Sequence, residues 1–283
     1  MSTAVKIFFL TAVLLCGIIK SILLQLYPGK EIDMIYVTSD LHGHMDCLEK
    51  LLAHVNFAGG DWLFIIGDVI DRNENGGVDI LKWLLVQPNV QLIAGNHELM
   101  ILANRWLFEQ VTDESIDELS PEHLRLLNHW KRNGGEVTMT ALHKESKETI
   151  QDILDYVVDC PLYESVCVNG RNYLLVHGGL GNFERGKQMS EYTAHDLVWT
   201  RPTFETVYAP DEFTLIIGHT PTAHYGEQYE NRMIKRESWW NVDTGAASST
   251  GRPMLLCLDN LMEYYIEDDG GVIGIKDGVV QSQ

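Results

Sequence analysis

Several clusters of polar residues in the sequence have the composition of a metal site. Each cluster supplies carboxylate, imidazole or amide groups, and the candidate ligands are Asp40, His42, Asp68, Asn96, His177 and His219. These are hard or borderline donors that suit Mn, Fe or Zn, and no thiolate is among them. A carboxylate such as Asp68 could bridge two neighbouring ions, as in two-metal hydrolases. The residue types therefore predict a site that binds metal ions.

Each cluster directly follows a segment that is expected to be a buried strand. These segments are IYVT (35–38), DWLFII (61–66), VQLIA (90–94), NYLLV (172–176) and FTLII (213–217). Short apolar runs rich in β-branched residues are typical of strands covered on both faces. Helix-like stretches such as residues 47–55 and 78–86 lie between them, so we expect an α/β sandwich. Ligands of such sheets bind beyond the carboxyl ends of the strands, where all five clusters fall.

The stretch LIAGNHEL (92–99) shows why the clusters must be considered together. A Gly-Asn pair is favourable turn chemistry, so by itself it indicates an ordinary loop. The same explanation, or a helix cap or a core histidine, would fit each of the other clusters singly. Five clusters at five strand ends instead indicate one shared site. The glycine beside each cluster permits a tight turn and a close approach of backbone to a ligand.

The overall composition is that of an acidic globular protein. The 283 residues are 45% hydrophobic and 22% charged, with a formal net charge of −19. This charge repels nucleic-acid phosphates, and no cluster of Lys and Arg offsets it, so we expect no nucleic-acid partner. The five cysteines are scattered and form no CxxC pair, which argues against a disulfide framework and favours a reducing, cytoplasmic location.

Residues 1–33 stand apart from the predicted catalytic domain, which spans residues 34–283. Residues 7–26 are almost wholly apolar and long enough for a membrane span, with Lys20 toward one end. They indicate either a membrane anchor, with the catalytic domain in the cytoplasm, or a start site assigned too early, since Met34 directly precedes the first strand. A cleaved signal peptide fits less well, because no small-x-small cleavage site follows. Membrane contact is expected only with a real anchor.

The polar motifs, in their order and spacing, resemble those of the calcineurin-like metallophosphoesterases, and within them the PPP-type Ser/Thr protein phosphatases. The motifs that carry the resemblance are SDLHG (39–43), GDVIDR (67–72), GNHE (95–98), HGG (177–179) and GHTP (218–221). Nuclease and purple-acid branches usually carry GHxH as the last motif, whereas here Pro221 stands at the second histidine position. This difference disfavours a nuclease.

The resemblance covers the chain from Ile35 to about Leu258. It looks closest to the small bacterial and phage-lambda phosphatases because of NHWKRNGG (128–135) and VWTRP (198–202). It implies a metallophosphoesterase β-sandwich flanked by helices, a four-layer α/β/β/α order, with a helical insertion. We place that insertion at about residues 109–165, where no metal motif occurs.

The resemblance implies two divalent metal ions, most simply Mn, with Fe and Zn as alternatives. One ion would be held by Asp40, His42 and Asp68. The other would be held by Asp68, Asn96, His177 and His219. Glu98, beside this set, fits a helix cap or a supporting residue. Asp243 in NVDTG fits a turn or a supporting position better than direct ligation.

Two arginines and an Asp–His pair complete the implied site. Arg72 and Arg201 would hold the phosphoryl oxygens, because their planar forks suit phosphate better than Lys does. His97 would be the general acid, with Asp71 orienting it and favouring its charged form. The chain departs from the usual DRG pattern at Asn73. Asn tolerates a positive φ, so the loop is expected to survive, but the aim of Arg72 is left open.

The implied function is hydrolysis of a phosphomonoester by a metal-activated hydroxide, as in a Ser/Thr protein phosphatase that could also accept Tyr esters. The alternative is a symmetrical diadenosine tetraphosphate hydrolase or another small-molecule phosphoesterase of the same fold, because both groups share the metal motifs. A third possibility, a catalytically dead relative used as a binding module, is disfavoured because all metal and acid residues are present. The expected partner is a phosphorylated protein or a small phosphoester.

The helical insertion is expected to contain two helices. One follows Ser120 as N-cap and Pro121 at the first position, and the other covers KETIQDILDYVVD (147–159). The insertion fits a wall of the substrate cleft or a plain scaffold. Trp130 within it fits an ordinary core tryptophan better than a residue of the cleft.

Overall fold

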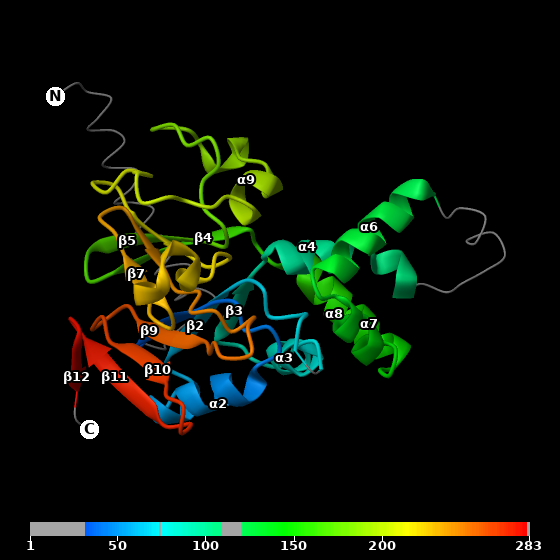
Figure 1. Ribbon diagram of the computed structural model, residues 1–283, viewed down its shortest axis with the longest axis horizontal. Coiled ribbons are helices and arrows are strands. Elements are labelled where there is room, and N and C mark those ends of the chain that lie inside the picture. The colour runs from blue at the N-terminus through cyan, green and yellow to red at the C-terminus, as the bar shows by residue number, and fades with distance from the viewer. Residues whose placement is uncertain (1–31, 74, 109–119, 282–283) are drawn as a thin grey trace.

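Two β-sheets packed face to face form the centre of the protein, and helices lie on their outer sides (Figure 1). The computed structural model describes residues 32–73, 75–108 and 120–281. One apolar cluster fills the space between the sheets, a second packs helices on the larger sheet, and a third covers the smaller sheet. The predicted α/β/β/α sandwich is confirmed.

The larger sheet has the strand order β12-β11-β10-β9-β1-β2-β3. Its first three strands in sequence pair in parallel, and the remaining strands add to β1 in antiparallel fashion. The strands are β1 (Ile35–Thr38), β2 (Trp62–Ile66), β3 (Val90–Ile93), β9 (Met254–Cys257), β10 (Glu263–Ile266), β11 (Val272–Lys276) and β12 (Val279–Gln281). A turn near residue 270 joins β10 to β11.

The smaller sheet has the order β4-β5-β6-β8-β7, with β5, β6 and β8 parallel. Its strands are β4 (Tyr163–Val168), β5 (Arg171–Val176), β6 (Thr214–Ile217), β7 (Ile234–Lys235) and β8 (Trp239–Asn241). All five strands that the sequence predicted are therefore present, each within a residue or so of the expected bounds.

Strand β2 shows why its residues form a continuous apolar run. Phe64 and Ile66 point into the cluster between the sheets, whereas Leu63 and Ile65 point into the cluster under the helices. Side chains alternate across a strand, so a strand buried on both faces needs apolar residues at every position. All five residues of β2 are buried.

Helices α2 (Met45–His54) and α3 (Val78–Leu84) pack on the larger sheet, and α4 begins immediately after β3. Helix α4 covers Asn96–Ala103, and the short helix α9 (Ala194–Val198) packs on the smaller sheet. No helix among the described ranges is long and apolar enough to cross a membrane. The apolar segment 7–26, and with it nearly all of residues 1–33, lies outside those ranges.

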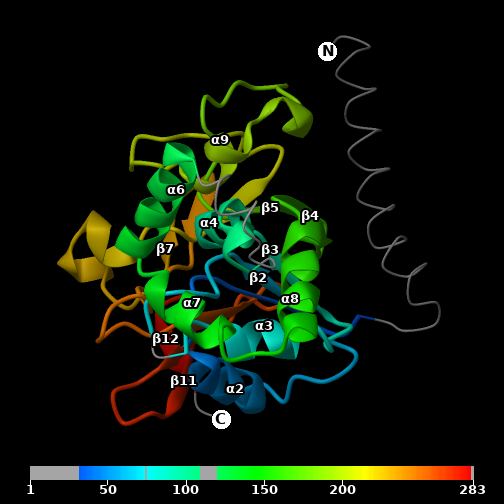
Figure 2. The same ribbon diagram turned by 90° about the vertical axis from the view of Figure 1, so that its right-hand side faces the viewer.

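The helical insertion lies beside the sandwich and faces the viewer in Figure 2. Its helices are α6 (Pro121–Arg132), α7 (Glu136–Leu142) and α8 (Lys147–Asp159). Ser120 caps α6 by accepting a hydrogen bond from the His123 N–H, as expected, and α8 has its predicted bounds. Helix α7 was not predicted. The insertion also ends before residue 165, because β4 already pairs with β5 from Tyr163 onward.

Candidate metal centre

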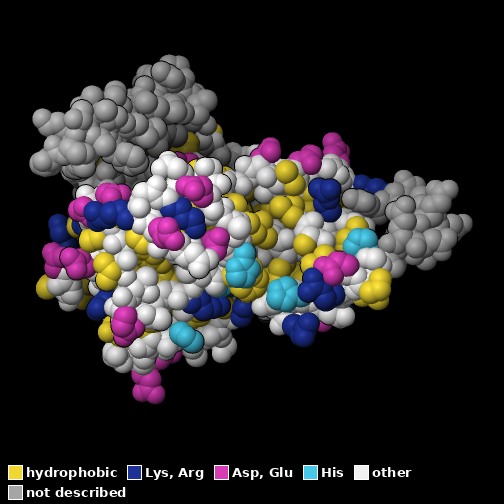
Figure 3. Space-filling model, turned by 90° about the horizontal axis from the view of Figure 1, so that it is seen from above, with side chains coloured by type: hydrophobic (Ala, Val, Ile, Leu, Met, Phe, Trp, Pro, Cys, Tyr) yellow, Lys and Arg dark blue, Asp and Glu magenta, His cyan; other side chains and the backbone are white. Residues whose placement is uncertain are grey.

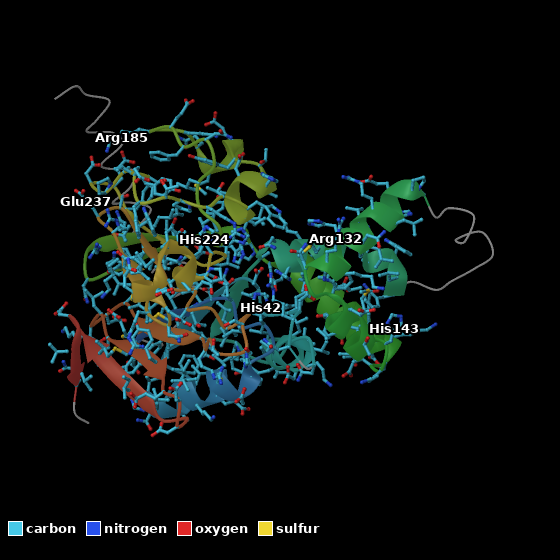
Figure 4. All side chains as sticks on the ribbon, in the orientation of Figure 1. His42, Arg132, His143, Arg185, His224 and Glu237 are labelled. Carbon is cyan, nitrogen blue, oxygen red and sulfur yellow. The ribbon has the colours of Figure 1, made fainter. Side chains whose placement is uncertain are left out.

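The predicted ligands come together at the carboxyl ends of the parallel strands of both sheets. Asp40 and His42 follow β1, Asp68 follows β2, and Asn96 opens α4 after β3. His177 and His219 follow β5 and β6 of the smaller sheet, and all six side chains are buried, with at most 6% of each residue exposed. His42 lies between the sandwich and the helical insertion (Figure 4).

The backbone of the site is unusual, because many of its residues adopt positive φ angles. They are Asp40 (47°), His42 (41°), Asp68 (55°), Asp71 (73°), Arg72 (70°) and His219 (66°). Such conformations cost roughly 1–3 kcal/mol each for residues other than glycine and persist where the surrounding fold enforces them. Their concentration at the strand ends is the pattern expected of a functional site, since they turn short side chains toward one point.

Asp68 is the centre of the cluster. Its Oδ2 lies 3.2 Å from Nε2 of His177, 3.7 Å from Nε2 of His97 and 4.0 Å from Nε2 of His42. Its Oδ1 accepts a hydrogen bond from the His97 N–H at 3.0 Å. A carboxylate in this position can contact both halves of the site, as the bridging role expected of it requires.

Backbone carbonyls orient two of the imidazoles. Nδ1 of His42 hydrogen-bonds the Ile70 carbonyl at 2.8 Å, and Nδ1 of His177 hydrogen-bonds the Ile66 carbonyl at 2.8 Å. A metal-binding histidine is usually held in this way by its other nitrogen. The arrangement leaves both Nε2 atoms directed at Asp68.

The close approach of these segments depends on glycine at position 67. Gly67 has a φ of 75°, and a Cβ there would lie 2.6 Å from Nδ1 of His177 and 2.6 Å from Cα of Gly95. A larger residue would push the end of β2 away from His177 and from the end of β3. Gly67 therefore shows both properties expected of glycine beside the clusters: it adopts a left-handed backbone conformation, and it allows other segments to approach closely.

The donor set fits divalent metal ions. Nε2 of His219 is buried and has no hydrogen-bond partner within the described residues, which is costly unless something else binds it. Potential ligand atoms of Asp68, His177 and His219 lie within 4.8 Å of one another, as do those of His42, Asp68 and His97. Oδ1 of Asn96 lies 3.0 Å from Nε2 of His177. The second ion's implied ligands are thus assembled.

The first ion's implied ligands are less compactly grouped than those of the second. Asp40 is buried among them, but its Oδ2 accepts a hydrogen bond from the His219 N–H at 2.9 Å. Atoms of His97, rather than of Asp40, complete the compact group around His42 and Asp68. The other Asp40 oxygen, Oδ1, takes no part in this hydrogen bond, so the carboxylate still offers one oxygen as a metal ligand.

Two buried carboxylates crowd one side of the site. Burial, together with the nearby Asp243 carboxylate, raises the pKa of Asp40 well above its usual range. Burial raises the pKa of Asp243 to about 6, and Asp68 contributes to this shift. Crowded carboxylates repel one another, and a divalent ion between them removes that repulsion.

Two of the candidate ligand histidines are kept neutral. Burial lowers the pKa of His42 to about 3 and of His219 to about 2, with neighbouring histidines adding to the shift. A histidine must be neutral to bind a metal, so both rings are in the required state at neutral pH. For His97, burial opposes the charged form, but the Asp68 and Asp71 carboxylates outweigh it and raise the pKa.

Asp71 and His97 form the expected pair. Nδ1 of His97 lies 2.5 Å from Oδ2 of Asp71, so the opposite nitrogen, Nε2, is directed into the cluster beside Asp68. The same Asp71 oxygen accepts a hydrogen bond from Nε1 of Trp130, at 2.8 Å. Trp130 is fully buried, as a core tryptophan would be, but it also reaches the site. Sequence reasoning missed this contact.

The two arginines are held in different ways. Nη1 of Arg201 donates to the His219 carbonyl at 3.0 Å and to Oγ1 of Thr220 at 2.8 Å. Arg72 is exposed, and no hydrogen bond or ion pair within the described ranges holds its guanidinium. Only its backbone N–H is fixed, by the Gly134 carbonyl at 3.1 Å. Arg201 is therefore pre-oriented, whereas no contact among the described residues fixes the Arg72 guanidinium.

Asn73, which stands where the DRG pattern has glycine, does not adopt the positive φ that we expected of it. That conformation falls on Asp71 and Arg72 instead. Nδ2 of Asn73 donates to the His42 carbonyl at 2.6 Å and to the Ala246 carbonyl at 3.3 Å. The asparagine thus ties two loops of the site together, which glycine could not do.

Glu98 and Asp243 have the supporting roles expected of them. Glu98 is fully buried and accepts backbone hydrogen bonds from Asp68 and Gly95, both at 2.8 Å, and from Val69 at 2.9 Å. It joins the end of β2 to the start of α4. Asp243 accepts a hydrogen bond from the Gly245 N–H at 2.9 Å, which stabilises a turn.

A profile of the calcineurin-like phosphoesterases matches residues 34–244, most of the chain. This chain belongs to the calcineurin-like phosphoesterase family. The buried Asp and His groups described above are its metal-binding candidates.

Curated relatives of this phosphoesterase include two bacterial enzymes named symmetrical bis(5'-nucleosyl)-tetraphosphatase. The enzyme of Chromobacterium violaceum is 30% identical over 102 residues, 35% of this chain and 36% of the relative. The enzyme of Serratia proteamaculans is 39% identical over 70 residues, 24% of each chain. The matches therefore span about a quarter to a third of these relatives.

Among solved structures, a cold-active protein-tyrosine phosphatase from a Shewanella species is similar in fold. The TM-score is 0.52 at 16% identity, and the match covers 88% of this phosphoesterase and 82% of the other chain. At that identity, the likeness concerns the fold alone.

Proposed function

We propose that this phosphoesterase is a bacterial-type Ser/Thr protein phosphatase that uses two divalent ions, most simply Mn. The observation that carries the proposal is the Asp71–His97 pair, whose free Nε2 is directed beside Asp68. The two segments that resemble bacterial protein phosphatases also contact this site, through Trp130 and Arg201. The net charge of −19 argues against a nucleic-acid substrate.

Phosphate binding falls to the two arginines. The fork of Arg201, fixed at the His219 carbonyl, presents its remaining N–H groups to one side of a phosphoryl group. Arg72 closes on the other side when substrate is present, because none of the described residues holds its guanidinium. Together they stabilise the charge that gathers on the phosphoryl oxygens as the ester bond breaks.

Proton transfer falls to His97. Asp71 holds Nδ1–H, so Nε2 carries the proton that passes to the departing oxygen of the serine or threonine side chain. Asp40, His42 and Asp68 would hold one ion, and Asn96, His177 and His219 with Asp68 the other. When bound, these ions supply Lewis acidity, which lowers the pKa of a water and neutralises phosphoryl charge.

A second candidate is a symmetrical diadenosine tetraphosphate hydrolase. It is favoured by the curated relatives of that name, which match part of this chain at 30% and 39% identity. The metal ligands, arginines and acid would act alike on a polyphosphate chain. The two candidates differ in the leaving group of the cleaved bond, which is a side chain of a peptide in one and a nucleotide in the other.

Analysis of the products formed by the metal-stripped protein, residues 1–283, distinguishes these candidates. The protein receives Mn²⁺ and either a phosphoserine peptide or diadenosine tetraphosphate, and products are quantified by chromatography. Mn²⁺-dependent release from the peptide with little dinucleotide cleavage supports the protein phosphatase. Preferred cleavage of the dinucleotide to two diphosphates replaces it with the second candidate, and no turnover of either overturns both.

A further inference from the structure

We propose that the helical insertion carries two positioning residues, Trp130 on α6 and Thr138 on α7, which fix Asp71 and thereby aim His97. This inference rests on the proposed role of His97 as general acid. It assigns to the insertion a part in catalysis, in place of the scaffold or cleft wall expected from the sequence.

The carboxylate of Asp71 is held from three directions. Oδ2 binds Nδ1 of His97 at 2.5 Å and accepts from Nε1 of Trp130 at 2.8 Å, while Oδ1 accepts from Oγ1 of Thr138 at 2.6 Å. The Asp71 N–H in turn donates to Oγ1 of Thr138 at 3.0 Å. Asp71, Trp130 and Thr138 are all fully buried. Water therefore cannot replace a missing partner without opening the core.

This arrangement determines the direction of His97. A carboxylate held only by His97 could rotate about its Cβ–Cγ bond and carry the imidazole with it. Trp130 and Thr138 each occupy one oxygen from a different helix, so this rotation breaks a buried hydrogen bond. Catalytic groups lose much of their effect when misplaced by about 1 Å. The two donors therefore keep Nε2 of His97 directed into the cluster.

Backbone contacts show that the insertion and the Asp71 loop are closely fitted. A Cβ at Gly76, in the loop that follows Asp71, would lie 2.4 Å from Cα of Thr138 on the insertion. The Arg72 N–H also donates to the Gly134 carbonyl. The segment from Trp130 to Thr138 thus contacts the Asp71–Arg72 backbone as well as the Asp71 side chain.

The test uses Trp130→Phe and Thr138→Val, which remove the N–H and the hydroxyl while keeping most of the packing. Matched controls are Trp239→Phe and Thr214→Val. Trp239 is fully buried and donates to the Thr206 carbonyl at 3.2 Å, and Thr214 is buried and accepts from Arg171 at 3.1 Å. The Trp239 indole and the Thr214 hydroxyl contact neither Asp71 nor the candidate ligands.

Each variant is assayed with Mn²⁺ on phenyl phosphate and on p-nitrophenyl phosphate, and its melting temperature is measured. Nitrophenolate leaves readily without a proton, so a misaimed acid affects phenyl phosphate more. We expect kcat on phenyl phosphate to fall about tenfold in each site variant, kcat on p-nitrophenyl phosphate less than about threefold, and KM to change little. The controls should lower the melting temperature similarly without changing the ratio of the two rates.

Combining each site variant with His97→Ala should add no further change in that ratio, because both act through the same group. Equal losses on the two substrates, or an unchanged ratio in Thr138→Val, would overturn the positioning role. If Trp130→Phe does not fold, Thr138→Val decides alone. A different result would contradict the proposed function: the wild-type protein would hydrolyse neither phenyl phosphate nor p-nitrophenyl phosphate.

Discussion

The carboxyl edge of the sandwich and the helical insertion contribute to the site in opposite ways. At the edge, each candidate ligand lies within four residues of a strand end, and several sit on a strained backbone. The described part of the insertion supplies none of these ligands, yet its Trp130 and Thr138 bind Asp71. Apolar and histidine side chains gather where the two regions meet (Figure 3).

This difference separates two tasks. The strand ends carry the groups that would bind ions, and loops beyond them carry the arginines that would bind phosphate. A rigid sheet is a precise support for the ion ligands. The insertion carries Trp130 and Thr138, which contact neither the ion ligands nor the arginines. They act on the orientation of His97 through buried hydrogen bonds to Asp71. A fold of this kind can therefore keep its ligand set while changes in the insertion alter the rate.

His97 is the residue where the two regions meet, and its removal should have the largest effect. His97→Ala should lower kcat on phenyl phosphate by about 10²–10⁴, because the leaving oxygen loses its proton donor. The metal content, measured by mass spectrometry, should stay that of the wild type. Loss of metal would instead assign His97 to the compact group that it forms with His42 and Asp68. An unchanged rate would exclude it as the acid.

Substitution of Arg201 tests a group on the sandwich side of the site whose guanidinium is already held in place. Arg201→Lys removes the planar fork, so KM for phenyl phosphate should rise by about tenfold, with a smaller fall in kcat. Steady-state kinetics measure both. Arg185→Lys is the control, because Arg185 pairs with Asp211 at the exposed surface. A KM unchanged in Arg201→Lys would mean that Arg201 only supports the His219 loop.

Asn73 should have the smallest effect. Asn73→Gly restores the usual family residue but removes the hydrogen bond to the His42 carbonyl. We expect a loss of about 1 kcal/mol in the free energy of unfolding, measured by urea titration, with kcat within about twofold. A tenfold fall in kcat would show instead that Asn73 helps to position His42.

The ligands and their strands could be predicted because the information is local. Asp68 follows β2 within two residues, and its motif is readable in a short window. The same holds for Ser120, whose capping role needs only the next three residues. Burial on both faces of β2 also follows from its unbroken apolar run.

The contacts of the insertion could not be predicted because they join distant residues. Trp130 and Asp71 are 59 positions apart, and Thr138 and Asp71 are 67 apart. Nothing in a short window distinguishes Trp130 from an ordinary core residue. The placement of the positive φ at Asp71 and Arg72, rather than at Asn73, likewise depends on how the Gly134 and Gly76 backbones meet that loop.

The most direct test of the central claim is a titration of the metal-stripped full chain with Mn²⁺, following bound metal and hydrolysis of p-nitrophenyl phosphate together. The wild type should bind two ions and gain activity as they bind, because Asp68 stands between two groups of ligands. Asp68→Asn should lose most of both, whereas Asp259→Asn, which alters a contact to the Ile35 N–H, should lose neither. Full hydrolysis by metal-free protein, or full metal binding and activity in Asp68→Asn, would contradict the account.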